Sequence, residues 1–176
     1  MRLSSLKHLI DAAKAISSCQ RVIILGSSAF LPLFPDLGEK DQILETSFDA
    51  DLVIEPCDEL TAKMLHEAIG EGSLFGAQNG YYIDVLRPSI KETLPAGWKE
   101  RLQALPGYSF VFFPDPYDLC LVKLKTGREK DLQIVQHLLQ TKKIEKSILR
   151  ERFNATPFLE KEVLAIAERI EKLGLS

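Results

Sequence analysis

The sequence predicts a mixed α/β (α+β) protein, in which a small mixed β-sheet is flanked by helices and followed by a C-terminal helical subdomain. Short runs of β-branched residues lie in the earlier part of the chain, whereas helical periodicity dominates after residue 115. A chain of 176 residues with 45% hydrophobic content is long enough for one well-packed core with an appended subdomain. We expect the core over residues 1–115, and the helical subdomain, packed on it, over residues 116–176.

The N-terminal part of the chain supplies a helix and two strands. Apolar residues recur at helical spacing over residues 3–16, which predicts an amphipathic helix. The continuous apolar run Arg21–Leu25 is typical of a central strand that is covered on both faces. Gly26–Ser28 then turns the chain toward a short helix or loop, and residues 35–47 form a polar connection. Asp49–Glu55 alternates between apolar and polar residues, as a strand with one buried face does.

The middle of the chain is expected to form a helix, a hairpin and a further strand. Asp58 is a plausible N-cap for a helix that runs to Ile69. The dipeptide Asn79-Gly80 is a strong signal for a two-residue hairpin turn, so it would join Ser73–Gln78 to Tyr81–Leu86 as antiparallel strands. Tyr108–Phe113 is predicted to form another strand, which Pro114 and Pro116 end.

That hairpin would fix the side chains on its second strand. Counting outward from the turn places Phe75 opposite Asp84. Tyr82, Asp84 and Leu86 would then share one face of the strand.

The C-terminal part is expected to be helical throughout. Helices are predicted over Tyr117–Lys125, Glu129–Gln140, Ile144–Arg152 and Phe158–Leu173, with Gly127 ending the first. The last helix carries a stripe of apolar residues expected to face the core, namely Leu159, Val163, Ile166, Ile170 and Leu173.

Charge and cysteine usage narrow the class of protein. The formal net charge is −3; residues 1–115 hold 10 basic and 16 acidic residues (−6), and residues 116–176 hold 12 and 9 (+3). An acidic half and a basic half suit a metal with its anionic ligand, but solvated helix faces give the same asymmetry. Cys19, Cys57 and Cys120 form no CxxC pair, which indicates a reducing cytoplasm. No apolar run reaches membrane-spanning length, so we expect a soluble cytoplasmic protein with no membrane partner.

Three carboxylates stand at revealing positions. Asp49 and Asp51 project from the same side of one strand, roughly 7 Å apart along the backbone. Asp84 lies within a run of strand-forming residues, where an unpaired buried carboxylate would be costly. Carboxylates that converge on one face call for a hard cation, so we expect these three to hold Mg²⁺ (or Mn²⁺). The alternatives are that Asp-x-Asp is turn chemistry and that Asp84 pairs with Arg87.

A phosphate contact is expected next to these acids. Gly26 allows the backbone to approach a phosphate closely, and the amides and hydroxyls of Ser27 and Ser28 can donate hydrogen bonds to it. The alternative is that the two serines only cap a short helix.

The segment DLCLVKLKTGREKD is a second candidate. Lys123 lies within a predicted helix, and Arg128, Lys130 and Asp131 follow the Gly127 break. Lysine offers a compact charge to a triphosphate, and arginine a planar fork. Alternatively, Arg128 and Asp131 form no more than a surface ion pair.

At this point a family resemblance becomes visible. The chain resembles the uncharacterised bacterial nucleotidyltransferase-like domains related to the AbiEii-type toxins in the strings LGSSAF, FDADLVI, GYYIDVLRP, LPAGWKERL and DPYDLCLVKLKTGREKDLQIV. The resemblance implies the nucleotidyltransferase-like fold. It also implies phosphate contacts from Gly26, Ser27 and Ser28, metal ligation by Asp49 and Asp51, a third acidic position at Asp84, and a nucleotide contact and a site-organising role for Lys123 and Asp131, with Arg128 and Lys130 completing the GREKD string.

The function implied is Mg²⁺-dependent transfer of a nucleotidyl group from a nucleoside triphosphate to an acceptor. The acceptor could be tRNA or a protein. If it is RNA, the chain could be the toxin of a toxin–antitoxin pair, with an antitoxin as its partner. The alternative is a catalytically inactive module of the same fold that binds nucleotide, regulates, or partners a toxin. Trp98 is expected to anchor packing rather than bind a ligand.

Overall fold

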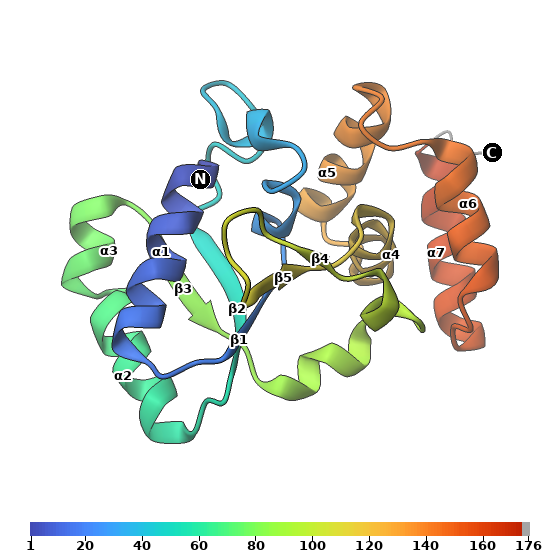
Figure 1. Ribbon diagram of the computed structural model, residues 1–176. Helices are drawn as coiled ribbons and strands as arrows, with labels where there is room; N and C mark the ends of the chain where they lie inside the picture. Colours follow the sequence, from blue (N-terminus) through green and yellow to red (C-terminus); the bar gives the residue numbers. More distant parts are fainter. Residues whose placement is uncertain (174–176) are drawn as a thin grey trace. The chain divides into compact units, whose positions relative to one another are not determined.

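The computed structural model describes residues 1–173, and the chain divides into two compact units (Figure 1). Unit 1 comprises Met1–Ile90 and Leu102–Pro114, and unit 2 comprises Lys91–Arg101 and Asp115–Ser176. The second stretch of unit 2 begins at Asp115, whereas the helical subdomain was expected from residue 116. Unit 2 also includes residues 91–101, which carry Trp98.

Unit 1 is built on a five-stranded mixed sheet with the strand order β3-β2-β1-β5-β4. The strands are β1 (Arg21–Ile24), β2 (Asp49–Glu55), β3 (Tyr82–Val85), β4 (Gln103–Ala104) and β5 (Val111–Phe113). The central strand β1 lies antiparallel to β2 and parallel to β5, and β2 lies parallel to β3. This mixed sheet with its flanking helices confirms the predicted fold class.

The central position of β1 follows from its composition. Val22, Ile23 and Ile24 are each at most 1% exposed, as expected of a strand covered on both faces. β5 is shorter than the strand predicted over Tyr108–Phe113, and the two-residue strand β4 was not predicted.

Three helices belong to unit 1: α1 (Leu3–Ile16), α2 (Glu59–Ile69) and α3 (Leu74–Asn79). α1 contacts α2, and both α2 and α3 contact β3 (Figure 1). Asp58 caps α2 as predicted, since its carboxylate accepts a hydrogen bond from the amide of Thr61 at 2.7 Å.

The predicted hairpin at Asn79-Gly80 is wrong. Residues 74–79 form α3, which Ser73 caps by accepting a hydrogen bond from the amide of Gly76. Gly80 adopts φ 73° and ends this helix in the left-handed conformation, so the dipeptide serves as a helix C-cap rather than a hairpin turn. β3 consequently pairs in parallel with β2, and no strand places Phe75 opposite Asp84.

Unit 2 is helical, as predicted. Its helices are α4 (Pro116–Thr126), α5 (Glu129–Gln140), α6 (Lys146–Ala155) and α7 (Glu160–Lys172). α4 contacts each of the other three and is the central helix of the unit. Gly127 has φ 69° and ends α4 in the left-handed conformation. Trp98 is 7% exposed, which agrees with a packing role.

The apolar stripe of the last helix is only partly buried. Ile166 and Ile170 are at most 5% exposed, but Leu159 is 63% and Val163 37% exposed. The expected core-facing stripe is therefore wrong for its N-terminal half, where Leu159, the N-cap of α7, and Val163 within α7 are exposed.

A buried carboxylate organises unit 2. Asp118 is fully buried, and it accepts hydrogen bonds from Arg101 at 2.8 and 3.0 Å and from Arg152 at 2.6 Å. Burial lowers the pKa of the Arg152 guanidinium, but its bonds to Asp118 and Asp115 outweigh that effect and raise the pKa overall. A buried carboxylate needs such partners, so this cluster fixes residues 91–101 against the helices of the unit.

No helix within residues 1–173 has both the length and the apolar character needed to cross a bilayer.

Candidate active site

The end of β1 meets the start of β2 at Gly26. The amide of Leu25 donates to the carbonyl of Asp51 at 2.8 Å, so Gly26 lies directly beside this aspartate. Gly26 has φ 59°, a conformation that favours glycine. A Cβ at this position would overlap the carboxylate of Asp51. The chain thus needs glycine here for two reasons, one of which is the position of the Asp51 side chain.

Register places the three predicted acids on one face of the sheet. Asp51 and Asp84 are direct partners on the parallel strands β2 and β3, and Asp49 is the partner of Tyr82. Paired residues on neighbouring strands point to the same face, about 4.8 Å apart, and residues two apart along a strand share it as well. Asp49 and Asp51 are half-buried and Asp84 is exposed. Asp84 therefore shares a face with Asp49 and Asp51 through the parallel pairing of β3 with β2, and not through the predicted hairpin.

The electrostatics of Tyr82 report this concentration of charge. The pKa of the Tyr82 phenol is raised, first because the group is partly desolvated, and further by the negative charges of Glu71, Asp49, Asp84 and Asp51. These carboxylates lie close enough to disfavour a further negative charge on the same face.

The arrangement of the carboxylates determines which cation they could bind. Within residues 1–173, no group of three or more His, Cys, Asp or Glu side chains gathers closely enough to form a metal site as it stands. The pair Asp51 and Asp84 is in register, with Asp49 two residues away on the same face. Magnesium commonly uses one or two protein carboxylates and keeps waters and phosphates as its other ligands, so this donor set fits it.

The two serines differ in what they offer. Ser28 is 1% exposed and its hydroxyl donates to the carbonyl of Leu25 at 3.4 Å, so its side chain belongs to the interior. Ser27 is half-buried and immediately precedes the short 3₁₀ turn Ser28–Phe30. Of the two hydroxyls, that of Ser27 is the more accessible next to Gly26.

In unit 2 a nearly buried ion pair joins α4 to the GREKD string (residues 127–131). The ammonium of Lys123 and the carboxylate of Asp131 are 2.7 Å apart, with side chains 7% and 15% exposed. Asp131 thus pairs with Lys123 across the turn, which differs from the surface pair with Arg128 that was the alternative. Arg128 and Lys130 are both exposed, on the first turn of α5 or just before it.

Arg169 on α7 stabilises the turn between α4 and α5. This residue was not predicted from the sequence. Its guanidinium donates to the carbonyls of Leu124 and Lys125, the second at 2.7 Å, at the end of α4. A Cβ on Gly127 would overlap Arg169, so the glycine also makes room for it. Nothing in the spacing of the chain links residue 169 to residue 127, and no local pattern could have found the contact.

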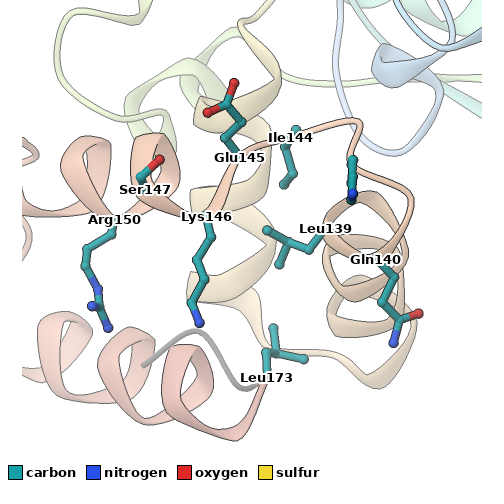
Figure 2. Close-up of a pocket in the computed structure, with 9 residues that line it drawn as sticks. Leu139, Gln140, Ile144, Glu145, Lys146, Ser147, Arg150 and Leu173 are labelled. Atoms are coloured by element: carbon teal, nitrogen blue, oxygen red, sulfur yellow. The ribbon is translucent and has the colours of Figure 1, made fainter.

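A groove elsewhere in unit 2 contains none of the predicted site residues. It has a volume of about 910 Å³ and lies where the end of α5 and the start of α6 meet the end of α7 (Figure 2).

Comparison with known proteins decides the family. The model of a family described as nucleotidyltransferase of unknown function (DUF6036) matches residues 2–168. The chain belongs to this family. The match covers the three acids, Gly26 and the GREKD segment, and stops one residue before Arg169. A search of curated proteins and a search of solved structures each found no match. The resemblance to the AbiEii-type toxins stays a prediction.

Proposed function

We propose that this member of a nucleotidyltransferase family transfers a nucleotidyl group from a nucleoside triphosphate to an acceptor, with Mg²⁺ or Mn²⁺ as cofactor. The observation that carries the proposal is the in-register pairing of Asp51 with Asp84, beside a glycine that the Asp51 carboxylate itself requires. Two paired carboxylates can bind a cation, and the glycine turn beside them leaves room for a phosphate; a purely structural role would need neither.

Asp49, Asp51 and Asp84 are the residues that would hold the metal ion. When bound, the ion neutralises charge on the phosphate oxygens. Asp84 is the exposed member of the set, so it is also the group best placed to accept the proton of the acceptor hydroxyl. The acceptor oxygen forms a bond to the α-phosphorus, the bond from that phosphorus to the β-phosphate oxygen breaks, and pyrophosphate leaves.

Phosphate contacts are proposed separately for each unit. In unit 1, the backbone at Gly26 and the hydroxyl of Ser27 would contact the triphosphate, while Ser28 contributes its amide. In unit 2, the exposed side chains of Arg128 and Lys130 are suited to bind phosphate oxygens.

Because Lys123 is nearly buried, we assign it a structural role in unit 2 rather than a phosphate contact. Because its ammonium is held by Asp131 at 2.7 Å, this pair organises the turn that presents the two exposed cations.

The test is label transfer from radiolabelled nucleoside triphosphates with Mg²⁺, offering mixed tRNA and total protein as acceptors. Asp51→Asn keeps the side-chain shape over Gly26 and removes the charge, so transfer should fall about a hundredfold or more, equivalent to about 2.7 kcal/mol. Asp41→Asn removes an exposed carboxylate at φ 64°, a backbone conformation that asparagine tolerates, and should leave transfer unchanged. Transfer that survives Asp51→Asn would refute the assignment.

The second candidate is an inactive module that binds nucleotide or regulates a toxin. Calorimetry with a non-hydrolysable triphosphate and Mg²⁺ separates the two. Tight binding without turnover in the presence of both acceptors supports the module. If tRNA is the acceptor, the toxin reading further expects an antitoxin that suppresses the transfer.

A further inference from the structure

Tyr82, at the start of β3, is an aromatic residue on the face of the sheet that carries the three acids. We propose that its ring stacks on the nucleobase of the bound nucleoside triphosphate, so that Tyr82 recognises the nucleoside half of this ligand. The inference rests on the nucleotide site proposed for unit 1, but it needs only binding and not transfer. It therefore applies equally to an active enzyme and to an inactive module that binds nucleotide.

Register places Tyr82 beside the acids. It is the direct partner of Asp49 on β2, and Asp84 follows it by two residues on the same face of β3. Neighbouring strands are about 4.8 Å apart, and residues two apart along a strand are roughly 7 Å apart, so both carboxylates are close to the ring. The side chain is half-buried, and β3 ends the strand order of the sheet (Figure 1).

The adjacent Tyr81 has a structural role that Tyr82 lacks. The hydroxyl of Tyr81 lies 2.8 Å from Nδ1 of His8 on α1, and its ring meets Phe75 of α3 edge-on, with centroids 6.0 Å apart. Tyr82 projects from the opposite face of the strand. Within residues 1–173, the hydroxyl of Tyr82 has no hydrogen-bond partner and its ring contacts neither an aromatic ring nor a cation. The π surface of Tyr82 is therefore available to a ligand.

The order of groups across the sheet matches the order of groups in a nucleoside triphosphate. The glycine turn after β1 lies on one side of β2, where the amide of Leu25 donates to the carbonyl of Asp51. Tyr82 lies on the other side, on β3, and β1 and β3 are roughly 10 Å apart across β2. A triphosphate that contacts the turn at Gly26, with its α-phosphate at the acids, therefore extends its ribose and base toward Tyr82.

A phenol ring between carboxylates suits a base better than a phosphate. Stacking on an aromatic side chain accepts any base, because every base has a π-face. The neighbouring Asp49 and Asp84 repel an anionic group at the ring, whereas they do not repel an uncharged base. Helix α3 lies against the root of the side chain, since a Cβ on Gly76 would stand 3.6 Å from the Cβ of Tyr82. This packing limits the rotamers of Tyr82 and so orients the ring before the ligand binds.

The test is calorimetry of the whole chain with Mn²⁺ and two ligands. The α,β-methylene analogue of ATP has a base and cannot be cleaved at the reacting bond, whereas inorganic tripolyphosphate has no base. Tyr82→Leu should weaken binding of the analogue about tenfold, because stacking is lost, and should leave the affinity for tripolyphosphate unchanged. Tyr82→Phe keeps the ring and should retain both affinities. An unchanged affinity for tripolyphosphate also shows that the variant is folded, and Tyr82→Val is a second variant that suits a strand if the leucine variant folds poorly.

The matched control is Tyr81→Leu, the same change one residue earlier on the opposite face, which should leave binding of the analogue unchanged. Asp51→Asn should weaken both ligands, because it acts on their shared phosphates. An unchanged affinity for the analogue in Tyr82→Leu, an equal loss for the two ligands, or a loss in Tyr82→Phe would overturn the stacking role. If the native chain binds the analogue but transfers no label, the proposed transfer fails and this inference stands. If the native chain binds neither ligand, both fail.

Discussion

Replacing Gly26 by alanine tests whether the turn after β1 positions the Asp51 carboxylate. Alanine at φ 59° costs about 1–2 kcal/mol, because left-handed backbone crowds its Cβ. In addition, the new Cβ would overlap the Asp51 carboxylate, which has to leave its rotamer at a further cost of about 0.5–1.5 kcal/mol. We expect a total loss of stability of about 1.5–3.5 kcal/mol, and with it a loss of affinity for Mn²⁺.

The control is Gly80→Ala, which imposes a similar backbone strain without any collision. Gly80 has φ 73°, and a Cβ there would meet no atom within 4 Å. Thermal unfolding should show a fall of about 2–4 °C per kcal/mol in both variants, larger for Gly26→Ala. Electron paramagnetic resonance titration with Mn²⁺ should show about tenfold weaker binding for Gly26→Ala alone. Equal destabilisation of the two variants, with Mn²⁺ binding intact in both, would refute the idea that this glycine positions the carboxylate.

Four further outcomes follow from the same contacts. Lys123→Met alone should lower the free energy of unfolding, measured in urea, by about 3–5 kcal/mol, because it leaves the nearly buried Asp131 without its charged partner. Adding Asp131→Leu should restore much of that loss. Strictly additive losses would contradict a coupled pair. Arg169→Gln should speed amide hydrogen exchange about tenfold at the turn that ends α4, with partial rescue by Arg169→Lys; unchanged exchange would exclude a positioning role. The pKa of Glu162 is lowered, first by the hydrogen bond from Lys125, so the ion pair stabilises the fold fully above the usual pKa of 4.5 and loses its effect as the pH falls through the lowered pKa. Glu162→Gln should therefore be less stable than the native chain at pH 7 and equally stable in acid. A difference in stability that persists in acid would count against the ion pair. Asp84→Asn should raise the melting temperature in EDTA by about 2–4 °C, because it removes the repulsion from Asp51, and it should abolish the stabilisation by Mn²⁺. A lower melting temperature in EDTA would show that the Asp84 carboxylate has a structural partner.

Local patterns predicted the elements of this fold well, and their connections less well. The continuous run of β1 and the N-cap Asp58 each act within a few residues, so the sequence suffices to place them. Asn79-Gly80 shows the limit of such signals. Left-handed glycine ends a helix as readily as it makes a hairpin turn, and the outcome depended on Ser73 capping a helix upstream.

In the candidate site, too, local features were predictable from the sequence and contacts between distant segments were not. The shared face of Asp49 and Asp51 follows from strand alternation alone and needed no tertiary information. The partnership of Asp51 with Asp84 depends on the parallel register of β2 and β3, which the hairpin prediction did not contain. Arg169 and the burial of Asp118 were out of reach, because both depend on residues brought together from distant parts of unit 2.

The proposed metal site would explain why Asp51 and Asp84 stand side by side on β2 and β3. Two carboxylates in register repel one another, by about 1 kcal/mol at 4 Å in bulk water and up to ~4 kcal/mol at an effective dielectric constant of 20. Gly26 adds the conformational cost of glycine to hold Asp51 where this repulsion occurs. Replacing the exposed Asp84 by an amide side chain would remove one of these two charges. Features that cost stability in the free protein are expected where a bound cation offsets them, and this is the stability–function balance that the Asp84→Asn experiment measures directly.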